Sequence, residues 1–178
     1  MGNKLTLGEA SFSIRDKQLH NVLTCNQMQL VKKSWNLLNG DLDTLGGIVF
    51  RRFFEIEPQL KIVFPKIVHI NHDNKLDANI DMDMLLRHGA VVMKALGAAV
   101  ESLGDSSCLN SVIITIGQIH CYRNVKPKMI KKLWPCLNYG LHAVLKENYT
   151  KEIAQAWRCL YYYMCGLMIH GMLNPDTD

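Results

Sequence analysis

Two histidines on apolar helical faces are the residues of this chain best placed to do chemistry. His88 shares a face with Leu85 and Val92, and His120 lies one turn beyond Ile116, because residues three or four positions apart lie together on a helix. The two histidines are 32 residues apart on consecutive predicted helices, so a helical hairpin can bring both imidazoles to face each other. A neutral imidazole is a good ligand for iron, and the gap suits a planar, largely apolar cofactor with a central metal. A single histidine on such a face is usually a hydrogen-bonded core residue, and the pair is more informative than either one alone.

The elements that must position these histidines are helices. Residues 66–80 form a polar stretch that we interpret as a loop, and Pro135 predicts a kink or break because proline removes a backbone donor. No segment of useful length alternates apolar and polar residues with a period of two, which favours an all-α fold. The 3.6-residue periodicity predicts helices over Asn26–Leu38, Leu42–Glu55, Met82–Leu103, Leu109–Cys121, Pro127–Glu147 and Lys151–Leu173.

Composition indicates one soluble globular domain without a nucleic-acid partner. The 178 residues are 48% hydrophobic and 20% charged, and the net charge of +4 is too small to argue for nucleic acid. No run of 18 apolar residues lacks a charge, so no membrane span is predicted. Six cysteines without a CxxC pair read as buried free thiols of a reducing, cytoplasmic compartment. No nucleophile motif or carboxylate pair supports a classical enzyme.

The N-terminus carries a short lipidation signal. Residues 1–6 fit the pattern M-G-x-x-x-[ST], which predicts myristoylation of Gly2; the alternative is a plain disordered terminus. One acyl chain binds membranes only marginally, and no cysteine precedes residue 25 to take a second. We interpret residues 1–24 as a mobile extension with a short helix near 13–22, 25–173 as the folded domain and 174–178 as a tail. If acylated, the protein is expected at the cytoplasmic face of the plasma membrane.

From about Asn26 to Gly171 the chain resembles the globin family, and within it the neuroglobin and globin X branch. The branch resemblance rests on the extension, on Trp157, and on the combination of Phe50 with His88. It implies the globin fold, with about eight helices arranged three over three, preceded by an N-terminal extension. The matching residues, in chain order, are Trp35, Phe50, Phe54, Pro58, Phe64, His88, Val92, His120, Val125, Trp157 and Tyr161.

The resemblance implies a haem b cofactor, iron protoporphyrin IX. His120 would be the proximal ligand, with its second ring nitrogen bonded to a carbonyl one turn earlier. Phe64 would stack on the porphyrin, and Arg87 or Arg123 would pair with a propionate. The remaining pocket residues implied are Phe50, Val92, Ile116, Val125, Ile130, Leu133 and Met164.

The distal residue, His88, has two possible roles. In the first role, it binds the iron directly in a bis-histidyl, hexacoordinate site, which suits electron transfer, redox signalling or gas sensing. The redox reactions of such a site would include reduction of O2 to superoxide or of nitrite to nitric oxide. Alternatively, it stays off the iron and hydrogen-bonds O2, as in a penta-coordinate storage or transport globin. A third possibility is a haem-free interaction module. The implied partners are O2 and other diatomic gases, together with an electron donor or acceptor of unknown identity.

Overall fold

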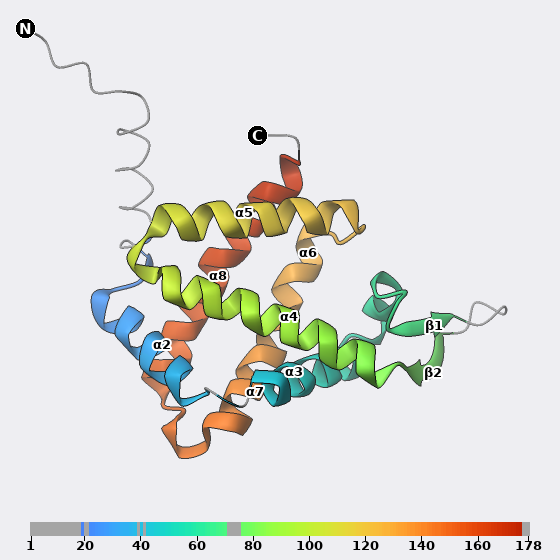
Figure 1. The fold of residues 1–178 in the computed structure, drawn as a ribbon, viewed down its shortest axis with the longest axis horizontal. Coiled ribbons are helices and arrows are strands. Elements are labelled where there is room, and N and C mark those ends of the chain that lie inside the picture. The colour runs from blue at the N-terminus through green and yellow to red at the C-terminus, as the bar shows by residue number, and fades with distance from the viewer. Residues whose placement is uncertain (1–18, 20–21, 39, 41, 71–75, 176–178) are drawn as a thin grey trace, which may run out of the picture.

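The computed structural model describes residues 19, 22–38, 40, 42–70 and 76–175, and this part of the chain is mainly helical (Figure 1). Four helices, which begin at Cys25, Met82, Ser106 and Lys151, are capped at their N-termini by a side chain that accepts a hydrogen bond from a backbone N–H. The capping residues are Thr24, Asp81, Asp105 and Thr150 respectively. The α-helices are α2 (Cys25–Leu37), α3 (Leu42–Ile56), α4 (Met82–Glu101), α5 (Ser106–Tyr122), α6 (Pro127–Ile130), α7 (Trp134–Leu145) and α8 (Lys151–Leu173). The 3-10 helices are η1 (Pro58–Val63), η2 (Ser102–Gly104), η3 (Lys131–Leu133) and η4 (Lys146–Asn148).

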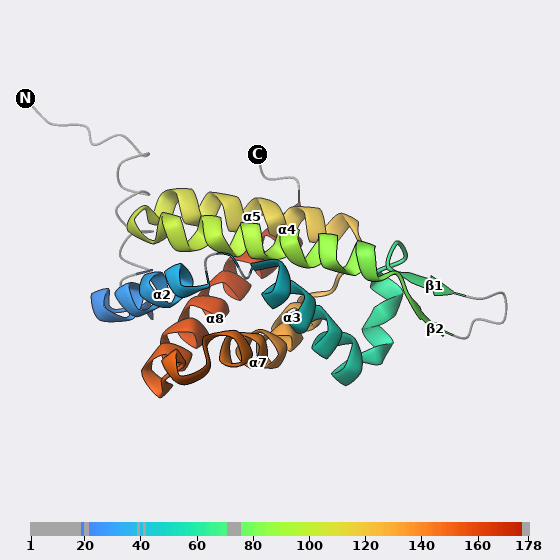
Figure 2. The same ribbon diagram turned by 60° about the horizontal axis from the view of Figure 1, so that its bottom comes forward.

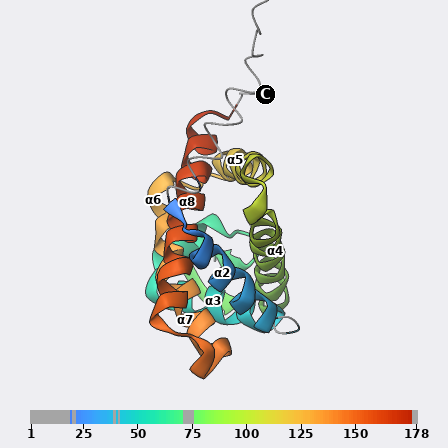
Figure 3. The ribbon, with the colours of Figure 1, turned by 90° about the vertical axis from the view of Figure 1, so that its left-hand side faces the viewer.

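The helices pack in two layers. Figure 2 shows α4 and α5 side by side above α3, α7 and α8. The view along the long axis in Figure 3 separates α4 and α5 from α7 and α8, with α2 crossing in front at one end. Within the described part of the chain, no helix combines the length and the apolar composition needed to cross a membrane.

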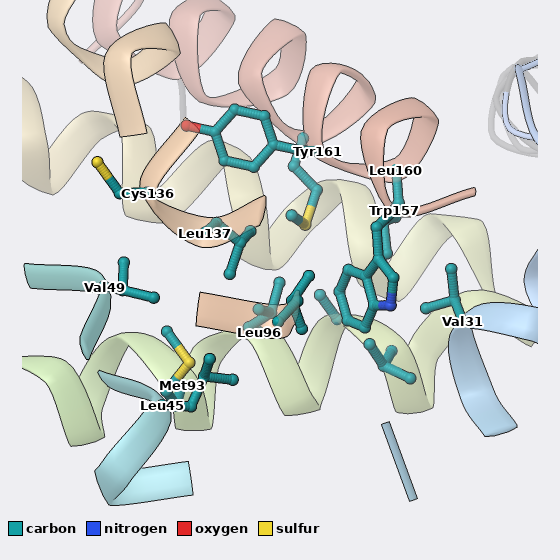
Figure 4. Close-up of a cluster of buried hydrophobic side chains, with 14 of the residues drawn as sticks. Val31, Leu45, Val49, Met93, Leu96, Cys136, Leu137, Trp157, Leu160 and Tyr161 are labelled. Carbon is teal, nitrogen blue, oxygen red and sulfur yellow. The ribbon is translucent and has the colours of Figure 1, made fainter. Parts of the chain in front are cut away.

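Trp157 is the largest side chain of the core. It is fully buried, and its indole N–H donates to Ser34 Oγ across 2.9 Å, so its polar atom is satisfied inside the core. Ser34 in turn donates to the Leu30 carbonyl. Figure 4 shows Trp157 pointing from α8 toward α4, with Val31 of α2 beside it. This hydrogen bond and the surrounding aliphatic side chains hold α2 against α8.

Two helix pairs approach so closely that only glycine fits between them. A Cβ built on Gly46 of α3 would lie 2.6 Å from the backbone of Gly89 in α4. A Cβ on Gly117 of α5 would lie 2.1 Å from the Met168 carbonyl oxygen of α8, and one on Gly171 would meet the Ile114 carbonyl at the same distance. Real Cβ atoms essentially never come within 3.0 Å of such atoms. The α3–α4 and α5–α8 pairs are therefore in direct backbone contact.

Three local predictions can be compared with the structure. The loop interpretation of 66–80 is wrong in part, because Val68–Ile70 (β1) and Leu76–Ile80 (β2) pair as an antiparallel hairpin whose short strands alternate apolar and polar residues. The break at Pro135 is confirmed: η3 separates α6 from α7, and the proline lies in the first turn of α7.

The packed core begins earlier than the predicted boundary at residue 25. Leu19 and Leu23 are 1% and 0% exposed, and the Leu23 N–H donates to the Leu19 carbonyl. Residues four apart share a helix face, so this leucine pair brings the end of the predicted mobile extension into the core. Most of the predicted helix near 13–22 lies outside the described residues.

Candidate functional site

The ring of His120 is oriented by its own helix. In the last turn of α5, His120 Nδ1 lies 2.8 Å from the Ile116 carbonyl oxygen. A carbonyl oxygen only accepts, so Nδ1 carries the proton and Nε2 keeps its lone pair. This confirms the predicted hydrogen bond one turn earlier, and it leaves Nε2 as the nitrogen able to bind a metal.

The chain turns sharply after His120 in a Schellman motif. The Val125 N–H donates to the His120 carbonyl and the Asn124 N–H to the Cys121 carbonyl, while Asn124 adopts the left-handed conformation at φ 59°. Asparagine is among the few residues other than glycine that tolerate this conformation. The motif brings Val125, a predicted pocket residue, back beside His120.

His88 lies on α4 in an aromatic surrounding. Its ring makes edge contacts with Phe50 and Phe64, at centroid distances of 4.7 and 5.4 Å. Phe64 also packs against Phe54 at 5.1 Å, so the ring of Phe64 is held from both sides. The Gly46–Gly89 contact explains this arrangement, because Phe50 is one turn after Gly46 and His88 directly precedes Gly89.

The electrostatic surroundings keep His88 neutral. Burial lowers the pKa of His88, and electrostatic interactions with His120 and Arg123 lower it further. Neutral imidazole is the form that binds metals, and no hydrogen bond partner for His88 occurs among the described side chains.

The structure brings some of the predicted pocket residues to the histidines and others only to the common core. Phe50 and Phe64 contact His88, whereas Ile116 and Val125 contact His120 through hydrogen bonds of their backbones. Gly2 lies outside the described residues. The others pack on the core without a recorded contact to either ring: Val92, Ile130, Leu133 and Met164.

These features fit a haem. Within the described ranges no group of three or more His, Cys, Asp or Glu could hold a bare metal ion. Two imidazoles on α4 and α5, flanked by aromatic and aliphatic side chains, suit a metal whose other ligands come from an apolar ring. The fold and the site thus define a mainly helical protein with the residues of a haem pocket.

Comparisons with known proteins agree. The globin family model matches residues 48–168. The neuroglobin of Tetraodon nigroviridis is 28% identical over 156 residues, covering 88% of this chain and 96% of that protein. A globin of Buccinum undatum is 30% identical, covering 78% and 93%. The solved structure of a hexacoordinated heme protein from an anhydrobiotic tardigrade superposes with a TM-score of 0.74 at 18% identity, covering 85% and 96%.

The chain belongs to the globin family, and the predicted three-over-three globin fold and the resemblance to neuroglobins are confirmed. Sequence reasoning missed the residues that hold the site together rather than line it. Asn124 was detectable, since an asparagine shortly after the last helical residue is a C-terminal capping signal. Gly46, Gly89, Gly117 and Gly171 give no such signal, because the sequence does not show which helix each one faces.

Proposed function

We propose that this protein is a bis-histidyl haem globin, with His120 and His88 both binding iron in the resting state, and that it acts in electron transfer, redox signalling or gas sensing. The observation that carries the proposal is the surrounding of His88. Phe50 and Phe64 hold its neutral ring, and the described residues supply no hydrogen bond partner for either ring nitrogen. An iron ligand bond would give this ring the partner that the described residues do not supply.

The residues of the site have different roles. His120 presents Nε2 because its other nitrogen is bonded to the Ile116 carbonyl, and this bond raises the basicity of the ring. Phe50 and Phe64 pack against His88 and offer no hydroxyl, so stabilisation of a bound gas would rest on His88. A bound haem b would supply reversible one-electron chemistry and binding of O2 or other diatomic gases.

A bis-histidyl site lowers every gas affinity by the fraction of molecules in which His88 has left the iron. The same two ligands serve both oxidation states, which suits electron transfer better than oxygen storage. The fold is compatible with two protein ligands, since the tardigrade protein of the same fold is described as hexacoordinated. Reduction of O2 to superoxide or of nitrite to nitric oxide would be outcomes of the same redox chemistry.

The ferrous spectrum without gas tests the coordination. We expect a sharp, split pair of visible bands in the purified haem-loaded protein, and a single broad band in His88→Leu. His170→Leu, an exposed histidine at the far end of α8, is the matched control and should keep the split pair. A broad band in the unmodified protein would instead indicate a penta-coordinate storage globin.

Replacing His120 tests whether haem is bound through this residue. In His120→Ala we expect the Soret band to shift or disappear, while far-ultraviolet circular dichroism stays helical. A Soret band that is unchanged in His120→Ala would contradict the ligand assignment. The absence of any Soret band from the unmodified protein after haem reconstitution would favour a haem-free interaction module.

We further propose that Gly2 is myristoylated and holds the protein at the cytoplasmic face of the plasma membrane. The support is the motif in residues 1–6. Mass spectrometry of the protein expressed with an N-myristoyltransferase should show the acyl mass on Gly2, and Gly2→Ala should lose both this mass and the membrane fraction. An unmodified Gly2 under these conditions would refute the proposal.

A further inference from the structure

The charges of this chain are distributed unevenly. Residues 106–146 contain no Asp or Glu but six basic residues, so this stretch has a charge of +6 while the rest of the chain has −2. Five of the six lie within ten positions: Arg123, Lys126, Lys128, Lys131 and Lys132. The modest net charge of the whole protein therefore conceals a strongly basic segment that begins directly after His120.

The structure shows which of these charges are free to act on a partner. Lys132 forms an ion pair with Glu57, which neutralises it. Arg123, Lys126, Lys128 and Lys131 are exposed, and none of them pairs with an acidic side chain of the described residues. We call these four residues the basic surface. It occupies the corner after α5 together with α6 and the start of η3.

The basic surface is attached to the candidate haem site by short backbone connections. Arg123 is the C-cap of α5, and the next turn is tied back by the bond from the Val125 N–H to the His120 carbonyl. On the other side, the Tyr161 hydroxyl donates to the Ile130 carbonyl across 2.5 Å, which fixes the end of α6 to α8.

The location of the surface favours a protein partner over the membrane. Figure 1 shows α6 beside one end of α5, whereas α2 lies toward the other end of α5. The basic surface begins directly after His120, so a partner bound to it lies beside the candidate haem site.

We propose that the basic surface is the docking face for an acidic electron-transfer protein, which it brings to the haem site beside His120. This inference rests on the redox function proposed above and names the class of its partner. A haem held by His120 and His88 would accept one electron from the reduced centre of the partner, and no bond would be made or broken in either protein. Opposite charges raise association rates by about 10- to 1,000-fold at low salt.

The test compares two triple charge reversals that change the net charge equally. K126E/K128E/K131E alters the basic surface, and K32E/K33E/K151E alters exposed lysines of α2 and α8. Arg123 stays unchanged because it follows His120 closely. The probes are a flavin joined to a hexaglutamate peptide and the same flavin joined to a hexaglycine peptide.

Two measurements are made with each variant. Fluorescence anisotropy measures binding of the hexaglutamate probe and is repeated on haem-free protein, so that it does not depend on redox chemistry. Flash photoreduction then measures the rate of haem reduction at about 20 mM and about 500 mM salt, where charge interactions are long-ranged and screened respectively. At low salt, we expect the basic-surface variant to lose roughly tenfold or more in its affinity for the hexaglutamate probe and in its rate of haem reduction by that probe. The control variant should stay within about threefold, and at high salt the differences should vanish.

Several results would overturn the proposal. Equal losses in both triple variants would show that net charge alone acts, and no loss in the basic-surface variant would show that the surface does not dock acidic partners. Binding of the basic-surface lysines to phosphatidylserine vesicles, with unchanged binding of the hexaglutamate probe in the variant, would identify a membrane contact instead. Failure of the hexaglycine probe to reduce the unmodified protein would count against the redox function, whereas the anisotropy result would still decide the docking.

Discussion

Replacing Gly117 by alanine tests the closest contact between α5 and α8. The added Cβ would lie 2.1 Å from the Met168 carbonyl oxygen, about 0.9 Å nearer than the 3.0 Å that real Cβ atoms respect. Neither atom belongs to a flexible side chain, so the two helices must separate. Since Gly117 lies one turn before His120, the shift would carry the proximal histidine with it.

The expected magnitude follows from overpacking. Extra volume in a packed core costs about 1–3 kcal/mol of unfolding free energy. For a protein of this size, a loss of about 2 kcal/mol lowers the melting temperature by roughly 4–8 °C. Gly166→Ala is the control, because Gly166 also lies in α8 and a Cβ there meets nothing within 4 Å. That variant should gain about 0.5–1 kcal/mol, since alanine restricts the unfolded chain and favours the helix.

Equilibrium unfolding in urea, followed by circular dichroism, measures both free energies. The free energies of unfolding of the two variants should differ from each other by about 1.5–4 kcal/mol, because one variant loses and the other gains stability relative to the unmodified protein. The visible spectrum of the ferrous haem-loaded Gly117→Ala should also change, whereas that of Gly166→Ala should not. Equal stability of the two variants would refute the conclusion that α5 and α8 are in backbone contact at Gly117.

Three further predictions concern the core and its titratable groups. Ser34→Ala should lower the free energy of unfolding by about 1–3 kcal/mol in urea titrations, because it leaves the buried indole N–H of Trp157 without an acceptor; a neutral result would show that this bond does not matter. Burial raises the pKa of Tyr149 to about 12, so above its ordinary pKa of about 10 the unfolded chain loses a proton that the folded chain keeps. Stability should therefore fall as pH rises from about 10 to 12, and less steeply in Tyr149→Phe, as thermal melts at stepped pH would show. Burial also raises the pKa of Cys136 and Cys165 to about 11. At pH 8, iodoacetamide should therefore label the two exposed cysteines, Cys25 and Cys108, first. Early labelling of Cys136 and Cys165 in mass spectra would contradict the packing.

The parts of the structure that depend on local pattern could be predicted from the sequence. The periodicity over Lys151–Leu173 predicted the bounds of α8 as observed, and the predicted helices that carry His88 and His120 are present as α4 and α5. The hydrogen bond from His120 to the preceding turn was also predictable, because it needs only the helix itself.

The parts that depend on contacts between distant segments could not be predicted. The crossing of Gly46 with Gly89 requires knowing which faces of α3 and α4 meet, and this contact in turn places His88 against Phe50. The β1–β2 hairpin was missed because its strands are too short for period two to stand out against the polar residues between them. The burial of Leu19 and Leu23 was missed because the extension lacks a strong period of its own.

The glycine contacts also have a mechanical consequence. Gly46 and Gly89 join α4 to α3, whereas Gly117 and Gly171 join α5 to α8, and α4 contacts α5 much less than each contacts its own partner. His88 therefore belongs to one closely packed pair of helices and His120 to another, so the separation of the two imidazoles depends on how the α3–α4 pair packs on the α5–α8 pair.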